Sequence, residues 1–182
     1  SFQIKKQNFF NNNFNFKNIG APKIININEK MNFHFFEMKY VNGLSYAEFF
    51  SGANVNQVYF VINSLFNYFD KLIYDNNEEK KISINEVVYE KISFLKKKSM
   101  YFSYLNFLQN IIEKKKYKLS KTFCHGDLTF ANIIFGNDKL YFLDFLDSYI
   151  DNFIIDLVKL KQELVYNWNL KIDNNSNFRI KQ

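Results

Sequence analysis

The chain has 182 residues, 47% hydrophobic and 23% charged, which suits one globular core and excludes a disordered or collagen-like chain. Its single cysteine excludes an internal disulfide and a zinc site made of cysteines, which favours a reducing compartment, and we expect a cytoplasmic protein. No run of 18 apolar residues occurs, so we expect no membrane span. The net charge of +6 fits lysines at helix ends better than nucleic-acid binding, which stays open as an alternative.

The N-terminal part of the chain is predicted to form strands. Residues 1–18 have no clear period of apolar residues, and the Gly-Ala-Pro sequence at 20–22 marks a turn. Apolar, aromatic and β-branched residues then predict strands at 23–28 and 33–41, joined by a polar connection.

From residue 45 the pattern becomes helical. Ser45 is a predicted helix N-cap, because Glu48 three residues later completes a capping box. Apolar residues at helical spacing predict helices over 58–73, 88–95 and 101–112.

Beyond residue 120 the chain is predicted to return to short strands before a last helix. The strands are expected at residues 122–124, 132–135 and 140–145, with Gly-Asn at 136–137 as the turn of a hairpin. A helical pattern follows at 153–168.

The segment from 123 to 157 holds six aspartates and one lysine, which makes it an acidic segment in a basic chain. Carboxylates gathered in one place repel one another unless a cation offsets their charge. The simpler explanation is that these aspartates lie apart, in surface turns and at helix caps. That explanation suits Asp138 beside the predicted turn. It suits Asp144 poorly, because a carboxylate within an apolar run is costly unless it is paired or binds a metal.

The spacing of three polar residues in this segment suggests phosphoryl transfer. Four residues separate Asp127 from Asn132, and Asp144 follows twelve residues beyond Asn132 at the end of a hydrophobic run. Phosphoryl transfer needs a carboxylate to accept the proton of the attacking hydroxyl, together with an amide oxygen and a second carboxylate to hold Mg²⁺. The protein-kinase signature places its base and its Asn ligand at the same four-residue gap, and its metal-binding Asp at the start of D-F-G.

These motifs resemble those of the aminoglycoside phosphotransferase and choline kinase family, which are relatives of the protein kinases. That family shows H-G-D-x-x-x-x-N and then a hydrophobic run ending in I-D-F or I-D-W, matched here by residues 125–132 and 142–145. An Asp-Leu pair at 156–157 and upstream similarities at 19–24 and 37–43 extend the resemblance over about residues 19 to 165.

The resemblance implies a role for each matching residue. Asp127 would be the catalytic base, and Asn132 and Asp144 would be ligands of Mg²⁺. His125 and Asp156 would be structural supports of the catalytic loop, with Asp156 accepting hydrogen bonds from the loop backbone.

The resemblance also implies a nucleotide site on the predicted hinge strand. Backbone groups of Met38, Lys39, Tyr40 and Val41 would contact the adenine of ATP, the phosphoryl donor. Cys124, although it is next to the loop, is expected to be a small buried apolar residue.

Two parts of the family's N-lobe have no counterpart here. No glycine precedes Gly20 and no glutamate precedes Glu29, so a glycine-rich phosphate loop and the helix glutamate are missing. Lys5 and Lys6 are candidates for the strand lysine, but they lie too near Pro22 for the usual intervening helix. We therefore interpret the chain as a fragment, a truncated gene product or a trimmed form.

The expected fold is α+β and resembles a protein kinase. Residues 1–41 would be a partial N-lobe and hinge strand, with a remnant of the N-lobe sheet. Residues 42–182 would form a mainly helical C-lobe, with a short β hairpin at the active site.

The expected function is ATP- and Mg²⁺-dependent phosphorylation of a hydroxyl on a small molecule. The acceptor would be a choline-like amino alcohol, an aminoglycoside or a sugar, and Asp147 and Asp151 slightly favour a cationic one. A truncated or inactive kinase-fold binding module is the alternative. The oligomeric state is not predicted.

Overall fold

The computed structural model describes residues 2–30, 33–74, 81–98, 102–114 and 116–166, and it confirms a mixed α+β class. The helices are α1 (Phe2–Asn13), α2 (Tyr46–Gly52), α3 (Val55–Tyr74), α4 (Ile84–Lys98), α5 (Phe102–Glu113) and α6 (Ile154–Tyr166). The strands are β1 (Ile19–Gly20), β2 (Ile24–Lys30), β3 (Phe33–Met38), β4 (Lys81–Ser83), β5 (Lys118–Ser120), β6 (Ile133–Phe135) and β7 (Leu140–Phe142). A short 3₁₀ helix, η1 (Phe130–Asn132), precedes β6.

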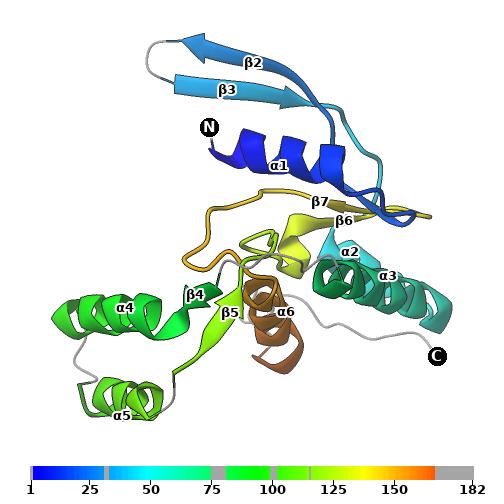
Figure 1. Ribbon diagram of the computed structural model, residues 1–182. Coiled ribbons are helices and arrows are strands. Elements are labelled where there is room, and N and C mark those ends of the chain that lie inside the picture. The colour runs from blue at the N-terminus through cyan, green and yellow to red at the C-terminus, as the bar shows by residue number, and fades with distance from the viewer. Residues whose placement is uncertain (1, 31–32, 75–80, 99–101, 115, 167–182) are drawn as a thin grey trace.

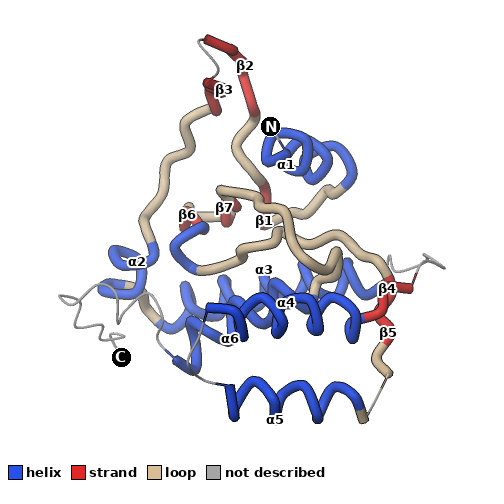
Figure 2. Tube along the Cα trace, turned by 90° about the vertical axis from the view of Figure 1, so that its left-hand side faces the viewer, coloured by secondary structure: helices blue, strands red, loops and turns tan. Residues whose placement is uncertain are grey.

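The strands form three small sheets. β1 pairs in parallel with β7, and β7 pairs antiparallel with β6, which gives the order β1-β7-β6. The β2–β3 hairpin and the β4–β5 pair are separate two-stranded sheets. In Figures 1 and 2 the β2–β3 hairpin stands above α1, whereas α3 to α6 lie below β6 and β7. The β6–β7 hairpin therefore lies near the middle of the molecule.

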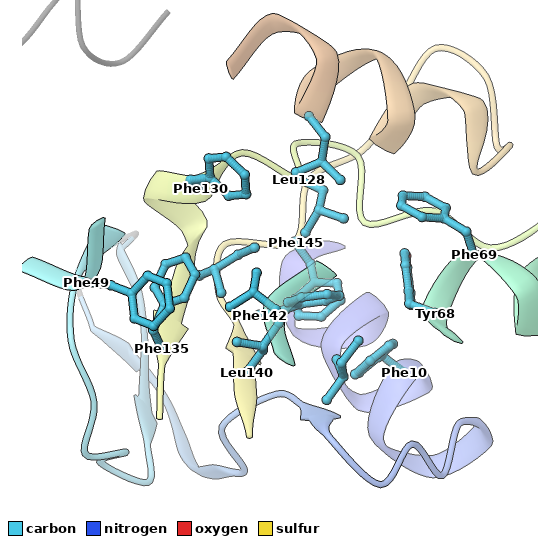
Figure 3. Close-up of a cluster of buried hydrophobic side chains, with 14 of the residues drawn as sticks. Phe10, Phe49, Tyr68, Phe69, Leu128, Phe130, Phe135, Leu140, Phe142 and Phe145 are labelled. Atoms are coloured by element: carbon cyan, nitrogen blue, oxygen red, sulfur yellow. The ribbon is translucent and has the colours of Figure 1, made fainter. Parts of the chain in front are cut away.

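Helix α1 contributes to the centre of the hydrophobic core, although no element was predicted there. The ring of Phe10 is 1% exposed and contacts Phe142 and Phe145, with ring centroids 6.0 and 5.4 Å apart (Figure 3). The buried side chains of α1 are Ile4, Gln7 and Phe10. A polar residue in the middle of this buried stripe hides the helical period from a sequence reading.

The structure confirms the expected hairpin at residues 132–145 but shortens its strands. β6 begins only after η1, and β7 ends at Phe142, because Asp144 adopts a left-handed backbone conformation with φ of 55°. Asp138 lies in the exposed turn, as expected.

The strand predicted at 122–124 is wrong. The backbone N–H of Thr122 donates to the carbonyl of Asp151, and the hydroxyl of Thr122 accepts from the N–H of Phe153. These bonds tie the segment to a loop, so its backbone joins no ladder. The strand lies earlier, at β5, where it pairs with β4.

The remaining predicted elements are present. The strands predicted at 23–28 and 33–41 form the β2–β3 hairpin, but β3 ends at Met38 and not at residue 41. Helices cover the predicted stripes at 58–73, 88–95, 101–112 and 153–168, of which residues 101, 167 and 168 lie outside the described residues. The capping box is confirmed, because the Ser45 hydroxyl accepts from the N–H of Glu48 while the Glu48 carboxylate accepts from the N–H of Ser45. In the described part of the chain, no helix combines the length and the apolar composition that a membrane span requires.

Candidate active site

The loop from His125 to Asn132 is closed by hydrogen bonds between its two ends. The side-chain amide of Asn132 donates to the carbonyl of Asp127 at 2.8 Å and to its Oδ2 at 3.1 Å. The N–H of Thr129 donates to the same carbonyl at 2.8 Å. The predicted base and the predicted amide ligand are therefore in direct contact.

Asp144 is brought to the same loop by the β6–β7 hairpin. The N–H of Leu143 donates to the carbonyl of Asn132 at 2.9 Å, and Asp144 is the next residue. Its side chain is exposed, and its Oδ1 accepts from the amide of Gln3 on α1 at 3.0 Å. The expected cost of burying this carboxylate in an apolar run does not arise, because the left-handed turn directs it outward.

His125 joins the catalytic loop to the segment around Asp144. Its Nε2 donates to the carbonyl of Leu143 at 2.7 Å, and its Nδ1 accepts from the N–H of Asp127 at 3.3 Å. Its own carbonyl accepts from the N–H of Leu146 at 3.0 Å. Burial lowers the pKa of His125 to about 4, so the imidazole is neutral at pH 7 and suits this donor and acceptor pair.

Asp156 lies at the start of α6 and accepts hydrogen bonds from the loop backbone. Its oxygens accept from the N–H of His125 at 2.7 Å and from the N–H of Gly126 at 2.9 Å. The hydroxyl of Tyr68 on α3 donates to it at 2.9 Å. Burial raises the pKa of Asp156 to about 6, although these three donors favour the charged form.

Gly126 is the position in the loop where only glycine fits. Its φ is 95°, and an added Cβ would collide with the carbonyl oxygen of Leu146. Close packing of the loop against the segment after Asp144 therefore depends on this glycine.

Lys159 was missed by the sequence analysis. Its Nζ lies 2.8 Å from Oδ1 of Asp127. A signal was available, because Lys159 lies three residues after Asp156 and therefore on the same face of α6. Gln3, which holds Asp144, gave no such signal, because residues 1–18 were assigned to no element.

Lys5 and Lys6 are not strand residues. Both lie on α1, and the Nζ of Lys6 donates to the carbonyl of Leu146 at 2.5 Å. Neither therefore occupies a strand that precedes a helix, as the family's lysine does.

The predicted adenine-contacting residues lie at the end of β3 and on the link to α2. The N–H of Lys39 donates to the carbonyl of Lys23 at 2.7 Å, so this group is already used within the hairpin. Tyr40 is 85% exposed. The link reaches β6 at Leu44, which exchanges two backbone hydrogen bonds of 2.9 Å with Phe135. The predicted adenine contact would therefore use the other backbone groups of Met38–Val41.

Within the described residues, Asp147 and Asp151 form no hydrogen bond or ion pair with Asp127, Asn132 or Asp144. Asp151 pairs with Lys121 at 3.1 Å, and Asp147 accepts from the N–H of Ser148 in an exposed turn. These two aspartates therefore give little support to a cationic acceptor. Cys124 is buried, and burial raises the pKa of its thiol, which matches an apolar packing role.

The residues at the site fit a magnesium ion. No three His, Cys, Asp or Glu side chains group together as metal ligands within the described ranges. Mg²⁺ does not require such a group, because it keeps several waters and binds one or two carboxylates plus substrate phosphates. The Asn132 amide nitrogen faces Asp127, so its side-chain oxygen is the atom that would bind a cation.

Comparison with known protein families decides what this segment is. Residues 98–174 match the model of the phosphotransferase enzyme family, named APH, and this range includes the loop from His125 to Asn132 as well as Asp144 and Asp156. This segment is similar to the phosphotransferase enzyme family. The resemblance to aminoglycoside phosphotransferases and choline kinases is thereby confirmed for it. Searches of curated proteins and of solved structures gave no match.

Proposed function

We propose that the protein transfers the γ-phosphoryl group of ATP, with Mg²⁺, to a hydroxyl of a small molecule. The contact between Asp127 and Asn132, with Asn132 also bonded to the residue before Asp144, carries this proposal. The proposal is supported by the similarity of residues 98–174, which include these three residues, to the phosphotransferase enzyme family. A carboxylate, an amide and a second carboxylate are the groups that phosphoryl transfer needs.

Asp127 would accept the proton of the acceptor hydroxyl. Its Oδ1 is held by Lys159 and its Oδ2 by Asn132, so both oxygens are fixed before an acceptor binds. A carboxylate oxygen has two lone pairs, so each oxygen retains room for one hydroxyl donor. A general base must lie within hydrogen-bond reach of the proton that it takes, and fixing its orientation serves that purpose.

Asn132 and Asp144 would hold the magnesium ion. When bound there, the ion neutralises charge on the phosphates of the nucleotide. Gln3 limits the motion of the Asp144 carboxylate, because it donates to one of the two oxygens. Backbone groups of Met38–Val41 would contact the adenine.

His125 and Asp156 would act as supports of the site. Asp156 fixes the start of the loop through two backbone N–H groups. His125 then fixes the segment after β7 through the carbonyl of Leu143. Each bond places Asp127 or Asp144 without touching a substrate.

The test is phosphorylation of three acceptor classes, namely choline-like amino alcohols, aminoglycosides and sugars, measured by ³¹P NMR with Mg²⁺ and ATP. Asp127→Asn should lower turnover by about 10²–10⁴, the usual range for a positioned general base, with little change in nucleotide affinity. Asp144→Asn should instead raise the Mg²⁺ concentration required and weaken nucleotide binding, since it removes a charged ligand.

Asp138→Asn is the matched control, because it makes the same change in the exposed turn of the same hairpin. It should leave turnover unchanged. Equal and small effects of all three substitutions would refute the assigned roles.

An inactive binding module is the second candidate function. It is favoured by the placement of Lys5 and Lys6, the two candidates for the family's strand lysine, on a helix. We expect weak Mg-ATP binding for this reason, measured by titration calorimetry. Binding without transfer to any acceptor would favour the module.

A further inference from the structure

A cavity of about 560 Å³ lies between α1 and residues 121–124, and its lining includes none of Asp127, Asn132 and Asp144. Its size is within the range of roughly 300–1,000 Å³ that small-molecule sites occupy. Four aromatic rings contribute to its wall, namely Phe2, Phe9, Phe14 and Phe123. The rings of Phe9 and Phe123 are stacked with centroids 5.8 Å apart, so they form one continuous aromatic part of the wall.

The charges around the cavity are mostly positive. Three lysines and one aspartate line it, and the aspartate, Asp151, already pairs with Lys121 at 3.1 Å. Lys6 and Lys5 supply the remaining positive charge. Lys5 forms no hydrogen bond or ion pair with any residue that the structure describes.

Lys6 stands between the aromatic wall and the backbone near the active site. Its Nζ lies 5.7 Å from the centre of the Phe2 ring and 6.0 Å from that of Phe123. It donates to the carbonyl of Leu146, and at 3.8 Å to the sulfur of Cys124. An ammonium group has three donors, so one remains for a ligand.

We propose that this cavity binds a small aromatic anion, with its rings against Phe9 and Phe123 and its anionic group at Lys5 and Lys6. An apolar pocket with a few converging polar groups is the usual form of a ligand site. A carboxylate, sulfonate or phosphate group would satisfy the two ammonium groups by charge-assisted hydrogen bonds.

A ligand in the cavity contacts the helix that also holds the active-site segment. On α1, Gln3 donates to Asp144 and Lys6 donates to the carbonyl of Leu146. The site therefore lies beside the proposed catalytic centre without sharing its residues. Its occupation does not depend on the proposed phosphotransferase activity.

The experiment uses titration calorimetry on the full 182-residue chain with two matched probes. Naphthalene-2-sulfonate is an aromatic anion, and naphthalene-2-sulfonamide carries the same rings without the charge. We expect one sulfonate per chain, and a sulfonamide affinity about tenfold lower, because the uncharged group loses a charge-assisted hydrogen bond.

Three variants locate the binding. Lys5→Glu should weaken sulfonate binding by about tenfold or more and leave sulfonamide binding unchanged. Lys23→Glu makes the same charge change at an exposed lysine outside the cavity, and should alter either affinity by less than about twofold. Phe9→Ala should weaken both probes by about threefold, since it removes one of the two stacked rings of the wall, and the 50% exposure of that ring limits the effect on stability.

Three results would overturn the proposal. The first is the absence of saturable binding of the sulfonate. The second is an equal loss for Lys5→Glu and Lys23→Glu, which would reflect general charge attraction. The third is a dimer in sedimentation velocity that Phe9→Ala dissociates, since a second copy of the chain would then cover this face. None of these results bears on phosphotransferase activity, because neither probe is a nucleotide or a proposed acceptor.

Discussion

The two β hairpins of this chain have the same topology and very different surroundings. In the β6–β7 hairpin the cross-strand partners Ile133 and Phe142 are both fully buried. In the β2–β3 hairpin Ile27 is 50% exposed, although it also faces an aromatic partner, Phe36. β6–β7 gains a third strand from β1, whereas β2–β3 is a two-stranded sheet. Isolated two-stranded sheets are marginally stable in water.

This difference separates the two halves of the proposed site. Asn132 and Asp144 flank the buried hairpin, so the surrounding core determines their positions. Met38 lies at the base of the exposed hairpin, where its sulfur accepts from the amide of Gln7 at 3.3 Å. The same amide donates to the carbonyl of Pro22 at 2.6 Å. The proposed phosphate side is therefore held by core packing, whereas the proposed adenine side depends on a few contacts at the base of a hairpin.

Amide hydrogen exchange tests the comparison most directly and should give the largest effect. Amides in β6–β7 should exchange only through global unfolding, whereas those in β2–β3 should exchange through local opening. The protection of the two hairpins should therefore differ by about 10²-fold or more. Mass spectrometry or NMR of the native protein measures this, and equal protection would contradict the comparison.

A matched pair of isoleucine substitutions converts the comparison into free energies of unfolding. Ile133→Ala should destabilise the protein by about 3 kcal/mol, because it leaves a cavity in the core. Ile27→Ala should cost less than about 1 kcal/mol, because its side chain is already half exposed. The change in strand propensity is the same in both, so the difference seen in urea denaturation reports burial. Equal losses would mean that β2–β3 is packed as tightly as β6–β7.

The pH dependence of stability tests the bonds that His125 makes beside the buried hairpin. The pKa of His125 is about 4 in the folded protein and near 6.5 in an unfolded chain, so only the unfolded state gains a proton between pH 7 and pH 5. The free energy of unfolding should fall by about 2 kcal/mol over this range through this group.

His125→Gln is the control, because glutamine does not titrate. The raised pKa of Asp156, about 6, acts in the opposite direction as the pH falls, but it is common to both proteins and cancels. Identical pH profiles of wild type and variant in urea denaturation would contradict a neutral buried His125.

The smallest expected effect on stability comes from a substitution at the N-terminus of α2, which follows the β2–β3 hairpin. Ser45→Ala removes the hydroxyl that caps α2 and should cost about 1 kcal/mol, since one helix N–H loses its acceptor. Thermal unfolding measures the loss. Ser51→Ala, in the same helix, is a suitable control, because its hydroxyl donates within the helix and caps no end. A larger loss from Ser51→Ala would exclude capping as the reason.

The parts of the site that were predictable are those carried by local spacing. The gap between Asp127 and Asn132 predicted their contact, because the loop that joins them is short and closes on itself. The Gly-Asn turn predicted the hairpin in the same way. Lys159 and Gln3 reach the site from α6 and α1, and such distant pairings depend on tertiary packing that local patterns do not contain.

Two errors have the same physical origin. The apolar run at 140–145 favoured a strand up to Phe145, but the positive φ of Asp144 ends it, a conformation that aspartate adopts more often than most residues but still only in a minority of cases. At 122–124 the β-forming residues were outweighed by two hydrogen bonds of Thr122, one donated to the carbonyl of Asp151 and one accepted from the N–H of Phe153, both in a distant loop. Tertiary contacts overrode propensity in both places.

The ultraviolet absorbance of Tyr68 can report on the loop that begins at His125, because its hydroxyl donates to Asp156, which holds the backbone of that loop. Of the 12 tyrosines in the chain, Tyr68 is fully buried, and its pKa is well above the usual value because of burial and the charge of Asp156. Its absorbance should therefore keep the short-wavelength form of a neutral phenol in alkali while exposed tyrosines shift to the phenolate band. Comparison with Tyr68→Phe isolates this signal. In an alkaline titration, the phenolate band of Tyr68 should appear at a higher pH than those of the exposed tyrosines. Its appearance would mark the pH at which the hydrogen bond between Tyr68 and Asp156 breaks.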